Sequence, residues 1–152
     1  MVQYQLDTSH KMVKRMLGGV DEDEARRTPS GGLAPIVWQV GHLALTDASF
    51  AKMASGAAVP GVPENYGDLF KGGSDGKGDF PSLSQVLEVF ETAHQAVARA
   101  AAEVNLEEPR ESRFGLFRNV GELFLFQIYH RGYHVGKIMS LRALLGKPRL
   151  LG

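Results

Sequence analysis

Hydrophobic residues recur every three or four positions in four stretches of the chain, the spacing that places them on one face of an α-helix. The first stretch covers residues 3–17 and stops at two consecutive glycines, as helices often do. The second begins at Pro35, a residue that suits the first turn of a helix, and continues to about Met53 before Gly56. Its predicted inner face consists of Trp38, His42, Leu45, Ser49 and Met53.

Two further helices are predicted from their starting signals. Ser82 and Gln85 can form a capping box, in which each side chain satisfies a backbone donor at the start of a helix. The third helix therefore begins there, and its apolar face comprises Val86, Val89, Phe90, Ala93, Val97 and Ala100. Asn119 with Glu122 offers a similar cap for a fourth helix, which extends to about residue 145 before Gly146.

The segments between these helices lack a regular hydrophobic period. Residues 21–32 are charged and then rich in turn-forming residues, which predicts a loop. Residues 57–80 contain two prolines and six glycines, which predicts a long loop over the helices, and such loops are often functional. We therefore expect an all-α fold, an up-down four-helix bundle in a single domain that covers residues 1–152.

The overall composition excludes several classes of partner. Seventeen basic and seventeen acidic residues balance, so no net positive charge attracts nucleic acid. No apolar run approaches the roughly 20 residues that cross a bilayer, and the N-terminus lacks an apolar signal core, so we expect a cytoplasmic protein without membrane contacts. Because the chain has no cysteine, any bound metal must be held by nitrogen and oxygen ligands.

Histidines supply the main chemical signal. His130 and His134 stand four residues apart on the inner face of the fourth helix, close enough to bind one ion together. This pair alone does not distinguish a metal site from two histidines that are satisfied by hydrogen bonds. His42 lies on the inner face of the second helix and can supply a third imidazole from the opposite side, as facing helices do in bundle metal sites.

Three sequence segments carry a resemblance to a known family. They are Trp38-Gln-Val-Gly-His42-Leu-Ala, Tyr129-His-Arg-Gly-Tyr-His134-Val-Gly-Lys-Ile and Leu145-Gly-Lys-Pro. In helix order and spacing the chain resembles the DinB-like, or YfiT-like, superfamily, which is distinct from the DNA polymerase of similar name. The resemblance implies a four-helix bundle, often a homodimer, in which His42, His130 and His134 bind nickel, zinc or iron.

Three imidazoles leave at least one coordination position open, which is typical of catalytic rather than structural metal sites. The resemblance implies a metal-dependent hydrolase, or a transferase that uses a low-molecular-weight thiol such as bacillithiol or mycothiol. The alternative is a dimeric interaction or sensing module that the metal holds together without catalysis. This alternative follows from the missing general base, because the predicted inner faces show no carboxylate near the three histidines and Asp47, five residues after His42, is expected to point elsewhere.

Four residues near the histidines are candidates for the pocket of a small-molecule substrate: Trp38, Thr46, Gln127 and Lys137. Each also has a structural interpretation, such as packing for the tryptophan or a buried hydrogen bond for the glutamine. The remaining histidines, His10 and His94, have no partner at metal-ligand spacing and are expected at the surface or bundle edge. Arg131 and Arg142 are expected to face solvent or another subunit.

Overall fold

The computed structural model describes the whole chain apart from residues 29–31, 75, 113 and 152. Its described residues form six helices and no strand. The helices are α1 (Val2–Met16), α2 (Glu22–Arg26), α3 (Ile36–Ser55), α4 (Tyr66–Phe70), α5 (Leu83–Glu103) and α6 (Val120–Leu144). In this described part of the chain no helix combines the length and apolarity that crossing a membrane requires.

The four predicted helices are confirmed as α1, α3, α5 and α6, with ends within about two residues of those expected. The capping box of Ser82 and Gln85 is present at the start of α5. At the start of α6, the side chain of Asn119 accepts a hydrogen bond from the backbone N–H of Glu122. Gly56 ends α3 with a φ of 76°, in the left-handed region that favours glycine.

Two short helices lie in segments that were predicted to be loops. The five residues of α2 follow Asp21, which forms a capping box with Glu24. The carboxylate of Glu22 then accepts hydrogen bonds from the backbone N–H groups of Leu83 and Ser84, so α2 is tied to the start of α5. The second short helix, α4, lies within the long connection of residues 57–80. Part of the first predicted loop, residues 29–31, lies outside the described residues.

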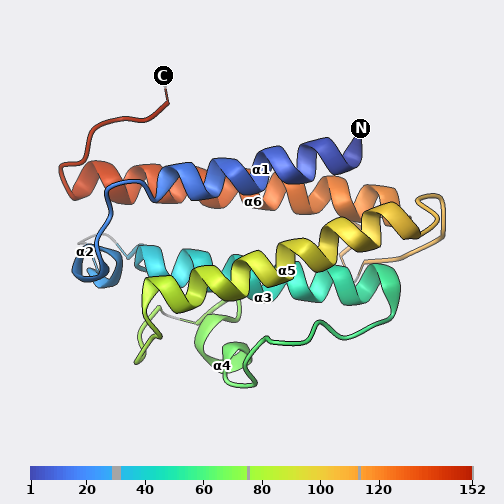
Figure 1. Cartoon of the computed structure of the whole chain (residues 1–152), viewed down its shortest axis with the longest axis horizontal. Coiled ribbons are helices and arrows are strands. Elements are labelled where there is room, and N and C mark those ends of the chain that lie inside the picture. The colour runs from blue at the N-terminus through green and yellow to red at the C-terminus, as the bar shows by residue number, and fades with distance from the viewer. Residues whose placement is uncertain (29–31, 75, 113, 152) are drawn as a thin grey trace.

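The directions of the long helices differ from the expected strict alternation (Figure 1). Helices α1 and α6 run in one direction, whereas α3 and α5 both run in the other. Consistent with this, Ser55 and Glu103 at the carboxyl ends of α3 and α5 line the same surface pocket. The up-down order is therefore wrong, because residues 57–80 carry the chain back to the end at which α3 began.

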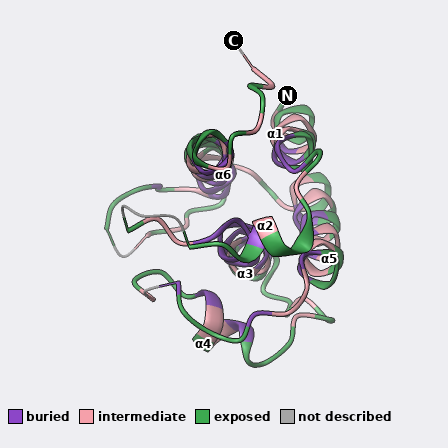
Figure 2. Ribbon diagram, turned by 90° about the vertical axis from the view of Figure 1, so that its left-hand side faces the viewer, coloured by how far each residue is buried: buried purple, intermediate pink, exposed green. Residues whose placement is uncertain are grey.

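Each long helix turns a buried face toward the others (Figure 2). The inner face predicted for α3 was wrong at Ser49 and Met53, which are exposed, whereas Asp47, Phe50 and Ala54 are buried. Residues 36–44 of this helix are buried all the way round, since α2 and α4 also pack on it. A helix covered on all sides has no clear polar face, and this explains why its inner face was misplaced.

Apolar residues form two clusters, and polar residues separate them along the helices. On α3 the first cluster ends at Ala44 and the second begins at Phe50, with Asp47 between them. On α6 the second cluster ends at Phe124 and the first resumes at Val135. We call the polar residues at this level the polar layer: His10, His42, Asp47, His94, Gln127, His130, Arg131 and His134.

Gly41 on α3 allows α4 to pack closely. A Cβ atom at this position would lie 2.3 Å from the ring of Phe70, which is fully buried. We predict that Gly41→Ala destabilises the fold by about 1–3 kcal/mol through overpacking, which outweighs the roughly 1 kcal/mol that alanine gains in a helix. Urea unfolding measures this change. Gly136→Ala is the control, because its Cβ would meet nothing within 4 Å; equal stabilisation of both variants would contradict the prediction.

Candidate metal centre

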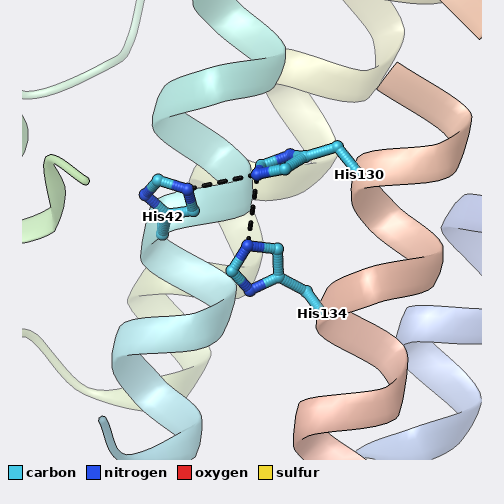
Figure 3. Close-up of side chains that lie close together, drawn as sticks. All are labelled: His42, His130 and His134. Atoms are coloured by element: carbon cyan, nitrogen blue, oxygen red, sulfur yellow. Dashed lines mark hydrogen bonds between the residues drawn. The ribbon is translucent and has the colours of Figure 1, made fainter. Parts of the chain in front are cut away.

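Three imidazoles from two helices converge in the polar layer (Figure 3). His42 comes from α3, and His130 and His134 come from α6. The Nε2 atom of His130 lies 3.3 Å from that of His42 and 3.2 Å from that of His134. A tetrahedral ion bonded to each nitrogen at about 2.0–2.1 Å would hold two such nitrogens roughly 3.3–3.4 Å apart. Both distances from His130 therefore match a single ion, and ligand nitrogens of all three histidines lie within 4.8 Å of one another.

Hydrogen bonds fix the orientation of two of these rings. The Nδ1 atom of His42 lies 2.8 Å from the carbonyl oxygen of Phe70, so this nitrogen carries the proton and donates it. The Nδ1 atom of His134 lies 2.7 Å from Oε1 of Gln39, whose amide nitrogen donates to the carbonyl oxygen of Ala34. Both imidazoles therefore direct an unprotonated Nε2 at the centre of the cluster, as metal-bound histidines do.

The third imidazole cannot satisfy both of these nitrogens by itself. If Nε2 of His130 is protonated, its single N–H can donate to His42 or to His134 but not to both. The Nε2 lone pair of the other histidine then still points at a nitrogen that donates nothing to it. A buried acceptor without a donor is unfavourable. The Nδ1 atom of His130 is also buried without a hydrogen-bond partner among the described residues. A cation shared by the three Nε2 atoms would remove the lone-pair conflict.

Burial keeps these imidazoles in the neutral form that binds metals. Burial, followed by the charges of His130, His42 and Lys137, lowers the pKa of His134 to about 2. Burial, followed by the charge of His42, lowers the pKa of His130 to about 4. The pKa of His42 is also lowered, again chiefly by burial. Near neutral pH no proton competes with a metal ion for the three nitrogens.

Aromatic side chains surround the cluster. The ring of Trp38 stacks on that of His42 with centroids 4.9 Å apart, and its Nε1 donates to the carbonyl oxygen of Leu69 and the hydroxyl of Ser74. Phe126 stacks on His130 at 6.3 Å. These contacts make Trp38 an anchor that joins α3 to α4 and to the residues just after it, in line with its structural interpretation.

The other three pocket candidates lie in different surroundings. The hydroxyl of Thr46 donates to the carbonyl oxygen of His42. Gln127 is fully buried and its Nε2 donates to Oδ1 of Asp47 at 2.8 Å, whereas its Oε1 has no partner among the described residues. Lys137 is partly exposed, and its Nζ lies 4.5 Å from the centre of the Tyr133 ring. Of the four candidates, Lys137 alone carries a charge that a ligand at the surface could meet.

The two groups that orient the histidines were missed in the sequence. Gln39 is fully buried three residues before His42, and a buried amide requires hydrogen-bond partners, so its position was a usable signal. The carbonyl of Phe70 gave no signal in the sequence, because every residue has a backbone carbonyl. Its role depends on how the segment around α4 packs against α3.

Four polar residues expected outside the core are buried. His10 and His94 are only 4% and 8% exposed and stack on each other between α1 and α5. Arg131 and Arg142 are 0% and 3% exposed, so their predicted contact with solvent or another subunit was wrong. Their guanidinium groups are satisfied inside the fold, by carbonyl oxygens of α1 in both cases. The prediction that these two arginines lie at the surface failed because their partners lie more than 100 residues away in sequence.

Comparison with protein families gives one match. Residues 5–138 match the DinB superfamily, a range that includes all three histidines of the cluster and most of the chain. No curated protein matches the chain.

We predict that Gln39→Leu lowers metal affinity about 10–100-fold, the usual effect of losing a partner that orients a metal-bound histidine. The substitution removes the acceptor for Nδ1 of His134 and leaves that donor buried without a partner. Competition for zinc with a coloured chelator measures the affinity. Gln95→Leu, an exposed change on α5, is the control. Equal affinities of the two variants would show that this hydrogen bond does not organise the site.

Proposed function

Because the chain belongs to the DinB superfamily, we propose that it binds one divalent metal ion through Nε2 of His42, His130 and His134. In this proposal the long helices form a four-helix bundle around an open metal site, which receives a small molecule. One observation carries the proposal: two imidazoles with fixed tautomers direct lone pairs at a third imidazole that cannot satisfy both. Nickel, zinc and iron all accept imidazole ligands.

The bound ion would supply Lewis acidity, by which it polarises a carbonyl group or promotes loss of a proton from a coordinated water or thiol. The chain itself orients the imidazoles of His134 and His42 through Gln39 and the Phe70 carbonyl. No carboxylate of the described residues hydrogen-bonds to these imidazoles, so the chain offers no general base there. This favours a thiol-dependent transferase over a hydrolase, because a coordinating thiol loses its proton without help from a base.

The metal content of the purified protein tests the proposal. We predict about one nickel, zinc or iron ion per chain after expression without a histidine tag in metal-replete medium, as three imidazoles support one ion. His130→Ala should lose the ion, since the two remaining imidazoles bind much more weakly. His10→Gln is the matched control, because His10 lies in the polar layer outside the cluster. Elemental analysis gives the result, and a native protein without metal would refute the site.

Lys137 indicates the charge of the proposed substrate. It lies one turn beyond His134 on α6, and its charge contributes to the lowered pKa of all three histidines. No carboxylate of the described residues forms an ion pair with it. Together with a divalent ion, this lysine makes the open position strongly positive. We therefore propose that the substrate carries a negative charge, as a thiolate or carboxylate does.

We predict that Lys137→Gln weakens the binding of thiocyanate to the cobalt-loaded protein about 3–10-fold, the effect of removing one charge several ångströms away at a partly exposed site. Binding of neutral imidazole to the same ion should not change. Visible absorption of the cobalt ion reports both affinities. Lys52→Gln, an exposed change on α3, controls for net charge. An unchanged thiocyanate affinity in Lys137→Gln would rule out this role for the lysine.

A non-enzymatic role is the alternative to catalysis, with the metal joining α3 to α6 in a dimeric interaction or sensing module. Removal of the metal by a chelator separates the two roles. A protein held together by its ion loses much of its thermal stability, whereas an open catalytic site loses little. The homodimer and the cytoplasmic location stay predictions.

A further inference from the structure

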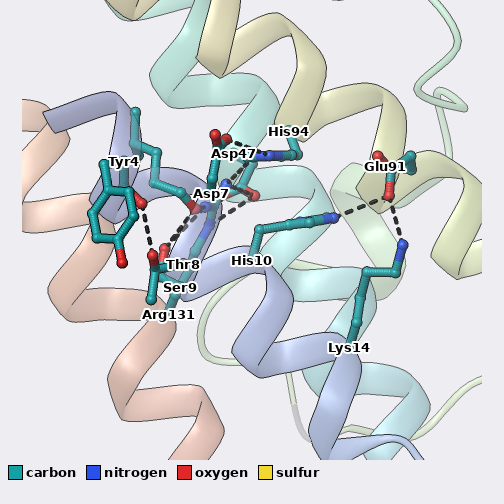
Figure 4. Close-up of polar contacts among 11 residues, drawn as sticks. Tyr4, Asp7, Thr8, Ser9, His10, Lys14, Asp47, Glu91, His94 and Arg131 are labelled. Carbon is teal, nitrogen blue, oxygen red and sulfur yellow. Dashed lines mark hydrogen bonds and ion pairs between the residues drawn. The ribbon is translucent and has the colours of Figure 1, made fainter.

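An ion pair between α3 and α6 lies within the polar layer (Figure 4). Asp47 on α3 and Arg131 on α6 are both fully buried. The Nη2 atom of Arg131 lies 2.7 Å from Oδ2 of Asp47, and its Nε lies 3.2 Å from the same oxygen. The Nε–Oδ1 distance is 3.3 Å. Two donors of one guanidinium thus meet one carboxylate, which fixes both distance and direction between the two helices.

The same carboxylate binds a second residue of α6. Oδ1 of Asp47 accepts a hydrogen bond from Nε2 of Gln127 at 2.8 Å. Gln127 and Arg131 lie three residues before and one residue after His130, so both are in the turn that carries this histidine. Asp47 lies five residues after His42 on α3. The hydrogen bonds therefore link α3 to α6 beside the residues that would bind the ion.

Arg131 also reaches the other two long helices. Its Nη1 donates to the carbonyl oxygen of Leu6 at 2.7 Å and to the hydroxyl of Ser9 at 3.1 Å, both on α1. Its Nη2 lies 3.3 Å from Nδ1 of His94 on α5. Because Nε2 of His94 faces the carboxylate of Asp7 at 3.2 Å and carries the proton, Nδ1 is the acceptor. One guanidinium thus contacts groups on α1, α3 and α5.

Stability alone does not explain an ion pair at this position. Replacing a buried ion pair by apolar residues of similar volume often leaves stability unchanged or raises it by about 1–4 kcal/mol. The histidine cluster requires that α3 and α6 keep a fixed relative position, which apolar packing does not ensure. His42 is on α3 and the other two histidines are on α6, so a slide or rotation between these helices changes the Nε2 distances directly.

We propose that Asp47 and Arg131 are positioning residues, which hold α3 and α6 in the register that brings the three Nε2 atoms to metal-binding distance. This inference rests on the proposed metal site. The pair as a whole carries no net charge, and the effect proposed for it is geometric. Arg142 offers a contrast, because it is a buried arginine on the same helix whose hydrogen bonds among the described residues go to the carbonyl oxygens of Met16, Gly18 and Pro148 and not to α3.

The test compares Asp47→Leu/Arg131→Met with Arg142→Met. Urea unfolding gives stability, and titration with cobalt(II) gives metal affinity and the visible spectrum of the bound ion. The double variant should fold with a cobalt affinity reduced about 10–100-fold, as when groups that orient metal ligands are lost, and with an altered spectrum. Arg142→Met should lose stability and keep the affinity and spectrum of the native protein.

A second variant, Asp47→Asn, covers the case in which the double variant does not fold. It keeps the shape of the side chain but replaces one accepting oxygen by an NH2 group, which only donates, so either Gln127 or Nη2 of Arg131 loses its acceptor. Its cobalt affinity should also fall. Native affinity and spectrum in these Asp47 variants would overturn the positioning role, and so would an equal loss of affinity in Arg142→Met. If the native protein itself binds no cobalt, the proposed metal site fails first.

Discussion

Polar groups buried in the middle of an apolar core are the constraint on which this structure depends. A helical core normally fills this level with aliphatic side chains, whereas here imidazoles and an ion pair occupy it. Each buried donor or acceptor without a partner costs about 1–3 kcal/mol. On one side of the layer, the ion pair accepts from the amide nitrogen of Gln127 and donates to His94, while Oε1 of Gln127 has no partner among the described residues. On the other side, the three imidazoles leave lone pairs that a cation would satisfy.

The connection between α3 and α5 contributes directly to the site. It returns the chain along the length of the helices, so α5 runs in the same direction as α3, and on the way it places α4 against α3 (Figure 1). Gly41 leaves room for the ring of Phe70, and the carbonyl of that residue then orients His42. Trp38 holds α4 and the residues after it through hydrogen bonds to Leu69 and Ser74. The irregular segment is thus part of the structure that orients the first ligand.

Hydrophobic spacing and capping signals predicted the four long helices and the starts at Ser82 and Asn119, because these signals are local. Spacing also predicted that His130 and His134 share a face, and the family resemblance added His42. The five-residue helices were missed since they are too short to show a period. The predicted directions of the helices were wrong because the length of a loop does not reveal at which end of the helices it finishes. The burial of Arg131 was missed because its partner, Asp47, lies 84 residues away.

The coordination of the bound ion tests the central claim most directly. An X-ray absorption spectrum of the zinc-loaded protein should show three imidazole nitrogens at about 2.0–2.1 Å, together with a ligand that does not come from the protein. That external ligand should exchange when a thiol is added. Fewer than three imidazoles, or a fourth protein ligand that closes the site, would contradict an open centre built from His42, His130 and His134.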